Sequence, residues 1–209
     1  TKKGLRRCGA VAINHACPAA HRCPNAERGA SLLPGDEPRP LLTYGDVPGE
    51  YAAATTDWVV FDETDRGAVS VAGEEASAFL HRLLANEVRD LPVGACAPNL
   101  LLDPKGKVRF PFDLERRGEG EFRLSTEPGQ AEALVEALDT FLFAEAVELL
   151  ETTDEHAPIT VAGPRAGEEL AGLTGDPPPT ESSARVTIGE AICCPSVMPR
   201  RSIRFLTLS

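Results

Sequence analysis

The feature that most constrains the fold is a tight turn between two apolar segments, written L-L-D-P-K-G-K-V over residues 101–108. Proline fixes φ at Pro104, and glycine tolerates a positive φ at Gly106, so this segment predicts a hairpin. After the turn, apolar and polar side chains alternate, which is typical of a half-buried strand. The pattern predicts two antiparallel strands, over residues 95–102 and 108–115.

Apolar periodicity predicts further strands near residues 58–61, 67–72, 122–124, 147–150 and 159–161, and helices at 50–55, 74–84, 128–142 and 165–170. After the first short helix, the order β-β-α-β-β-β-α-β-β-α predicts an α+β fold, an antiparallel β-sheet with packed helices. Pro111 lacks an N–H, so we expect it at a strand edge or a bulge. The Gly- and Pro-rich residues 175–179 are expected to end the regular region.

The charge and composition exclude several classes of protein. With 42% hydrophobic residues, the chain has enough apolar material for a core, and no apolar run approaches the roughly 18–20 residues that span a bilayer. The formal net charge of −11 disfavours direct nucleic-acid binding, because excess acid repels phosphates. Five of the six cysteines lie near the two ends of the chain and only Cys96 lies between them, which favours a reducing, cytoplasmic location over a disulfide scaffold.

Residues 1–40 show no sustained period and are expected to be irregular. They contain the thiols of Cys8, Cys17 and Cys23 and the imidazoles of His15 and His21. Structural zinc sites use ligand pairs separated by two to four residues, whereas the cysteines here are spaced C-x8-C and C-x5-C. We therefore expect no native metal site.

No common catalytic motif is present: the sequence lacks G-x-S-x-G, H-E-x-x-H and a P-loop. His81 is expected to face solvent on the polar side of its helix, and His156 to lie in an acidic surface turn. Cys96 is expected to be a small buried hydrophobic residue. Motifs alone therefore identify no chemistry.

Three stretches resemble a folate-binding family that includes the aminomethyltransferase (T-protein) of the glycine cleavage system and the YgfZ-type proteins. They are V-S-V-A-G-E-E-A-S-A-F-L-H-R-L-L-A-N-E-V (69–88) with the following D-P-K-G-K turn, F-L-F-A-E-A-V-E-L (141–149) and I-T-V-A-G-P-R-A (159–166). The resemblance covers residues 41–175 and implies the N-terminal portion of an aminomethyltransferase-like fold. Residues 1–40 and 176–209 lie outside it.

Within this family, the T-protein carries an acidic pair after its Gly-Gly turn. Here the corresponding residues are Val108, Arg109, Phe110 and Pro111, so no carboxylate is available to orient or deprotonate an amine. The D-P-K-G-K and F-A-E-A-V-E-L stretches are similar to the YgfZ branch instead. That resemblance implies a non-catalytic protein that binds tetrahydrofolate and supports iron–sulfur proteins and tRNA modification.

The resemblance implies a folate site at the hairpin. It comprises Arg66, Leu101, Leu102, Asp103, Lys105, Gly106 and Val108. The leucines and the valine would form apolar walls, and Lys105 would lie near the glutamate tail of folate. Arg66 stands where YgfZ-type proteins place an aromatic residue that stacks on folate.

Two alternatives remain open. The first is a tetrahydrofolate-dependent aminomethyltransferase in which Asp113 replaces the missing acid. The second is a truncated interaction module, because the family's K-G-C-aromatic-x-G-Q-E signature and its C-terminal β-barrel belong to a later half. The tail from Ile192 fits no family pattern, so a partial gene product is expected.

Overall fold

The structure is a computed structural model that describes residues 16–17, 31–32, 39–43, 45–63, 65–174, 186–188, 191–193, 196–198 and 202–208. Its helices are α1 (Val47–Thr56), α2 (Ala76–Leu83), α3 (Ala131–Asp139), α4 (Ala166–Thr174) and the 3-10 helix η2 (Thr153–Glu155). Its first strands are β1 (Ala16–Cys17), β2 (Ser31–Leu32), β3 (Arg39–Thr43), β4 (Val59–Asp62), β5 (Gly67–Ala72), β6 (Cys96–Leu102) and β7 (Val108–Gly118). The others are β8 (Glu121–Thr126), β9 (Glu148–Glu151), β10 (His156–Ala162), β11 (Val186–Ile188), β12 (Ala191–Cys193), β13 (Ser196–Met198) and β14 (Ser202–Leu208).

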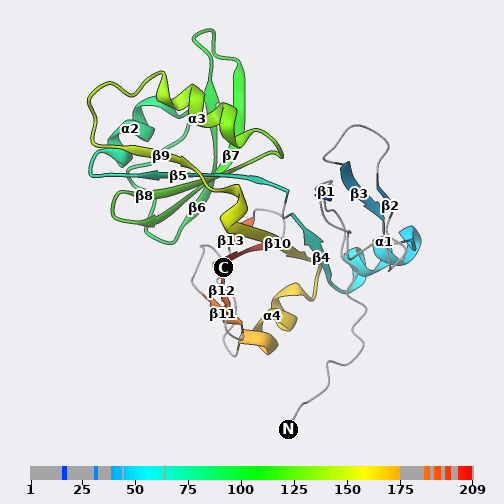
Figure 1. Ribbon diagram of the computed structural model, residues 1–209. Helices are drawn as coiled ribbons and strands as arrows, with labels where there is room; N and C mark the ends of the chain where they lie inside the picture. The colour runs from blue at the N-terminus through cyan, green and yellow to red at the C-terminus, as the bar shows by residue number, and fades with distance from the viewer. Residues whose placement is uncertain are drawn as a thin grey trace.

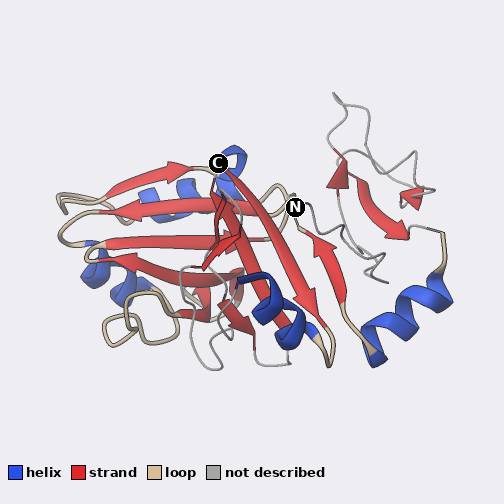
Figure 2. Cartoon of the chain, turned by 90° about the horizontal axis from the view of Figure 1, so that it is seen from below, coloured by secondary structure: helices blue, strands red, loops and turns tan. Residues whose placement is uncertain are grey.

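The described strands form three antiparallel sheets. The five-stranded sheet has the order β6-β7-β8-β5-β9, and a second sheet has the order β11-β12-β14-β10-β4 with β13 paired to β14. A small third sheet has the order β1-β3-β2. Figure 1 shows α2 and α3 close to the five-stranded sheet, while Figure 2 shows the short helices around the strands rather than between them. The predicted α+β class with antiparallel sheet is confirmed.

The predicted element order is confirmed from β4 to α4, where the chain runs β-β-α-β-β-β-α-β-β-α apart from the added turn η2. The bounds of the second long helix differ, because α3 begins at Ala131 and ends at Asp139 instead of covering residues 128–142. Gly129 adopts φ +70° just before it, a left-handed conformation that no α-helix continues through. Local backbone geometry therefore sets where this helix begins.

Regular structure does not end at residues 175–179, contrary to the prediction. Four strands follow, and β14 pairs with β10 along seven positions from His156↔Leu208 to Ala162↔Ser202. Long-range pairing stabilises this segment, which carries no strong local pattern. Within the range expected to be irregular, β1, β2 and the start of β3 are strands, whereas Cys8, Cys23, His15 and His21 lie outside the described residues.

One face of the five-stranded sheet carries the main hydrophobic core. Phe79 and Leu80 of α2 and Leu134 and Leu138 of α3 are almost fully buried in it. They meet apolar side chains of the strands, including Val69, Val71, Phe112, Leu114, Phe122 and Leu124. Burying one such side chain contributes about 1.5–3 kcal/mol. This layer of helices on sheet is therefore the main source of stability.

The hairpin formed by β6 and β7 extends beyond its neighbour β8. Pairing between β7 and β8 begins at Phe112↔Thr126, so residues 108–111 of β7 pair with β6 alone. Pro111 lies on this stretch with a free edge, as its missing N–H predicts. The register shifts where Leu101 and Leu102 face Phe110 and Val108, which makes Arg109 an extra residue in β7. Figure 1 shows this hairpin projecting from the sheet.

The connection after α3 is held in place by polar contacts. The Glu145 carboxylate accepts hydrogen bonds from the N–H groups of Phe143 and Ala144, at 3.0 and 3.1 Å, and from Arg82 at 2.7 Å. These bonds, that of the Phe143 N–H foremost, lower the pKa of Glu145 to about 2. The same connection packs on Gly73, where a Cβ would overlap the carbonyl oxygen of Ala146.

None of the helices within the described residues is long and apolar enough to cross a membrane.

We expect Gly73→Ala to destabilise the fold strongly. Gly73 has φ +144°, and the new Cβ would collide with the backbone of Ala146, so strain and overpacking add to about 3 kcal/mol or more in the free energy of unfolding. Gly129→Ala is the matched control, because Gly129 has φ +70° but nothing within 4 Å of its Cβ position. It should lose only about 1–2 kcal/mol. Equal losses in urea unfolding would contradict the packing argument.

Candidate functional site

The five-stranded sheet has a second face, opposite its helix-covered core, that is lined by polar side chains. Strand register aligns Ser70 with Arg123, Arg123 with Glu115, and Glu115 with Cys96. In the next row, Asp113 lies opposite Ser125. Directly opposed residues of antiparallel strands project to the same side, so these side chains share one surface. We call these six residues the polar face.

A buried ion pair lies at the centre of the polar face. Arg123 is 1% exposed and Glu115 is 5% exposed. Arg123 donates from Nε to Glu115 Oε2 at 3.1 Å, and its Nη2 contacts the same oxygen. The buried Nη1 has no acceptor in the described part of the chain. Two charges removed from water in this way must neutralise each other.

A second guanidinium holds the other carboxylate of the polar face. Arg66 donates from Nη2 to Asp113 Oδ2 at 3.4 Å and to the carbonyl oxygen of Ser125 at 3.1 Å. Its Nη1 is 3.9 Å from a carboxylate oxygen of Glu127. The side chain of Arg66 is therefore oriented along the sheet and engaged with Asp113. Asp113 itself is buried, with a relative exposure of 9%.

The hairpin turn is fixed by Asp103. Its Oδ1 accepts hydrogen bonds from the N–H groups of Lys105 and Lys107, both at 2.8 Å. Its backbone N–H donates to the carbonyl of Lys107 at 2.8 Å, and its carbonyl accepts from the N–H of Gly106 at 2.9 Å. Gly106 has φ +79°, as the predicted turn requires. The Lys105 and Lys107 side chains are exposed.

The three apolar residues predicted to line the folate site do not share one surface. Leu101 is 2% exposed and belongs to the core cluster, so its side chain packs beneath the helices. Val108 is 55% exposed on the projecting part of the hairpin, and Leu102 is half-buried. The alternation of side chains along a strand separates Leu101 from Leu102. Of the three apolar residues predicted to contact folate, only Leu102 and Val108 are therefore accessible to a ligand.

The predicted residues form two separate groups along β7. Val108, next to the turn, and Asp113, the partner of Arg66, are five residues apart in one strand, which corresponds to about 16 Å. A hydrogen bond does not bridge that distance, so Arg66 is not part of the Lys105 turn. Any single ligand that contacts both groups must lie along the strand.

The positions after the turn hold no carboxylate in the structure either. Phe110 is 6% exposed within the core, and Pro111 is exposed at the free edge of β7. The next acidic residue along the strand is Asp113, which Arg66 engages. No group at residues 108–111 is therefore able to accept a proton from an amine.

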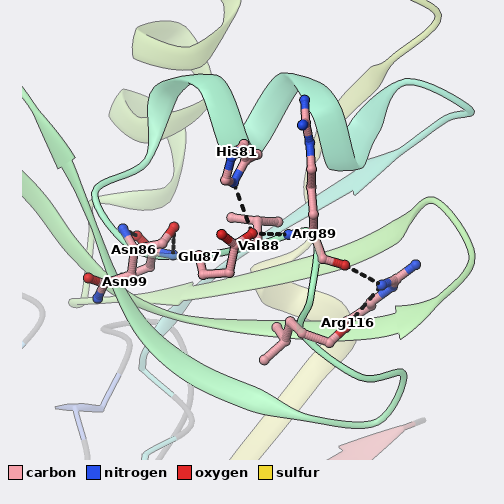
Figure 3. A network of polar contacts seen from close by, with 8 residues as sticks. His81, Asn86, Glu87, Val88, Arg89, Asn99 and Arg116 are labelled. Atoms are coloured by element: carbon pink, nitrogen blue, oxygen red, sulfur yellow. Dashed lines mark hydrogen bonds and ion pairs between the residues drawn. The ribbon is translucent and has the colours of Figure 1, made fainter.

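The loop after α2 contains a polar network that the sequence did not reveal (Figure 3). Glu87 Oε1 accepts from the N–H groups of Val88 and Arg89 at 2.9 and 2.7 Å, and these bonds, that of Arg89 foremost, lower the pKa of Glu87. The Nδ1 atom of His81 lies 3.1 Å from the same oxygen. His81 is half-buried here, so the prediction that it faces solvent is wrong because the loop folds back over the helix.

Two further side chains fasten this loop to the sheet. The Oδ1 atom of Asn99 accepts from the N–H of Asn86 at 3.1 Å, and Asn86 donates to the carbonyl of Pro98 at 2.9 Å. Arg116 donates from Nη1 to the carbonyl oxygens of Arg89 and Leu91, at 3.2 and 2.9 Å (Figure 3). These contacts join the loop to the sheet through hydrogen bonds within the protein, so we assign this network a structural role.

An open pocket of about 470 Å³ lies between the start of α3 and η2. Its lining is Gly129, Ala131, Glu132, Glu151, Thr153 and Asp154. None of these is a predicted site residue. Three carboxylates in the lining would repel the carboxylates of folate, so this pocket does not suit that ligand. Within the described residues, no three His, Cys, Asp or Glu side chains are arranged to hold a metal ion.

We expect Glu115→Gln to cost about 3 kcal/mol in the free energy of unfolding, because it leaves the Arg123 charge buried without a counter-charge. The double variant Glu115→Leu/Arg123→Met removes both charges and should recover most of this loss. Glu119→Gln is the control, since the Glu119 side chain is 90% exposed and its ion pair with Arg116 is worth less than about 1 kcal/mol. Denaturant unfolding measures the stability of all three variants. A double variant that is less stable than Glu115→Gln would refute the charge explanation.

Comparison with known proteins places this arrangement in a family. The family model described as "GCVT N-terminal domain" matches residues 43–191. An aminomethyltransferase of Thermus thermophilus is 30% identical over 133 residues, which are 64% of this chain and 38% of that protein. The corresponding enzyme of Paraburkholderia phymatum is 32% identical over 154 residues, 73% of this chain and 40% of its own length. The chain thus spans about two fifths of these relatives.

Among solved structures, the glycine cleavage system aminomethyltransferase T from Bartonella henselae superposes with a TM-score of 0.75 at 21% sequence identity. The match covers 88% of this chain and 51% of that protein, and it shows that the fold is shared. The relatives are named for aminomethyl transfer and give nothing specific for the YgfZ branch. The chain belongs to the GCVT N-terminal domain family of the aminomethyltransferase superfamily.

Proposed function

We propose that this chain binds folate without transferring an aminomethyl group. The observation that carries the proposal is that residues 108–111, the stretch after the turn where the resemblance implies an acidic pair, hold no carboxylate. Of its last two residues, Phe110 lies in the core and Pro111 is exposed at the strand edge. Amine transfer to folate requires a group that orients or deprotonates the amine. Family membership supports tetrahydrofolate as the ligand, while these two residues argue against the transfer reaction.

The folate site that we propose is the outer part of the hairpin. Val108 and Leu102 supply apolar contact, and the Lys105 ammonium attracts the glutamate carboxylates of folate. Asp103 and Gly106 shape the turn that carries Lys105. Leu101 supports this turn from the core rather than touching the ligand. Arg66 contributes only if the ligand extends along β7 to Asp113.

The finer assignment is a YgfZ-like role in support of iron–sulfur proteins, including one that modifies tRNA. It rests on the D-P-K-G-K turn and the F-A-E-A-V-E-L stretch of the sequence. With a net charge of −11, the link to tRNA would run through a client protein rather than through direct contact. A cytoplasmic location fits such a role.

A second candidate function is aminomethyl transfer, favoured by the names of the curated relatives. The carboxylate available for it is Asp113 on the polar face. Arg66 already engages this carboxylate, with its Nη2 3.4 Å from Asp113 Oδ2. Transfer would therefore require the substrate to displace Arg66.

We expect millimolar tetrahydrofolate to raise the melting temperature of the chain, because a ligand that binds the native state stabilises it. Lys105→Glu should weaken this binding several-fold, more at low salt than at high salt, with less than about 0.5 kcal/mol change in stability. Arg89→Glu makes the same charge change at another exposed site and should bind like the parent. No shift for the parent would overturn folate binding, and equal affinity of Lys105→Glu would remove the turn from the site.

We expect no tetrahydrofolate-dependent ammonia release from an aminomethylated donor by this chain. Activity in the parent that Asp113→Asn abolishes would establish the second candidate and refute the first. Ser125→Ala serves as the control. It changes the side chain directly opposite Asp113, while the backbone carbonyl of residue 125 still binds Arg66.

A further inference from the structure

The tip of the β6–β7 hairpin concentrates positive charge on an otherwise acidic chain. Lys105, Lys107 and Arg109 are all exposed, and none makes an ion pair within the described residues. Against Asp103 they give residues 100–111 a charge of +2, so the rest of the chain carries −13. Of these three cations the folate proposal uses only Lys105, and the Arg109 guanidinium lies 5.4 Å from the centroid of the Phe110 ring.

The backbone that carries these cations is preorganised. Four hydrogen bonds to Asp103 hold the turn, from or to Lys105, Gly106 and Lys107. The extra residue Arg109 in β7 bends the strand locally, and such bulges re-aim a side chain. A rigid, projecting turn loses little conformational entropy when it binds, which favours a role in recognition.

An exposed apolar residue lies between two of these cations in the sequence. Val108 is 55% exposed and stands between Lys107 and Arg109 in the chain. Because consecutive residues 104–109 are all exposed, both faces of the two-stranded tip are open to solvent, and the three side chains give it a mixed basic and apolar surface. Its complement is an apolar side chain with carboxylates on both sides.

We propose that the hairpin tip is a docking arm for a short acidic segment of a partner protein, in which glutamates or aspartates flank an apolar residue. Lys107 and Arg109 bind the carboxylates, and Val108 contacts the apolar side chain. The arm shares Val108 with the proposed folate site, but it binds the carboxylates through Lys107 and Arg109, which that site does not use.

The charge distribution favours a short protein segment over a nucleic acid. Screening limits the attraction to about 8–10 Å around the tip at physiological salt. A longer polyanion would extend over the remaining −13 charge and be repelled. Phosphates would also leave Val108 without an apolar contact.

The test uses the full chain and a fluorescently labelled peptide, Glu-Glu-Leu-Glu-Glu, followed by anisotropy at low salt. We expect weak binding that Lys107→Glu and Arg109→Glu each reduce about fivefold, since each reversal replaces attraction with repulsion at an exposed site. Val108→Ser should reduce it as well. Arg89→Glu makes the same charge change away from the tip and should leave affinity unchanged, and circular dichroism checks that all variants are folded.

Three results would overturn the docking arm: parent affinity in both charge reversals, equal binding of a Gln-Gln-Leu-Gln-Gln peptide, or tighter binding of an RNA pentamer. The folate proposal is tested separately in the parent chain, by the rise in melting temperature that tetrahydrofolate is expected to cause. Loss of peptide binding with retained folate binding supports the arm, whatever the fate of the proposed function.

Discussion

The five-stranded sheet buries both of its faces, and that constraint governs the rest of the structure. One face is apolar and packs on α2 and α3, while the other buries the charges of Glu115 and Arg123. Charges removed from water are tolerated only when they neutralise each other, so the registers of β7 and β8 must place these two residues opposite one another. A slip of one residue would put Arg123 into the hydrocarbon core.

The same register determines what chemistry the sheet offers. It brings Asp113 opposite Ser125 and within reach of Arg66, so a carboxylate that would otherwise be a candidate base is already engaged. It also places Phe110 in the core. Both results follow from alternation along β7, and together they shift the interpretation from transfer of an amine to binding of a folate.

The extension of β7 past β8 has the opposite effect, because it frees side chains instead of burying them. Pro111 and the extra residue Arg109 prevent further pairing along this edge, so the tip stays two-stranded and exposed. Since Asp103 keeps the turn rigid, the exposed lysines are carried on a defined surface. The sheet supplies stability, and the part of the hairpin that leaves it carries the residues that we propose for recognition.

The sequence by itself determined the α+β class, the element order from β4 to α4 and the turn at Asp103. Each of these depends on a local pattern, either apolar residues that recur every two to four positions or the residue types that form a tight turn. Only the tertiary structure decided that Leu101 faces the core, that His81 is half-buried beside Glu87 and that β14 joins β10. The Glu115–Arg123 pair also required it, although an arginine inside the apolar stretch F-R-L gave a hint. These features depend on which strands become neighbours, and pairing between distant segments leaves no periodic trace in either segment alone.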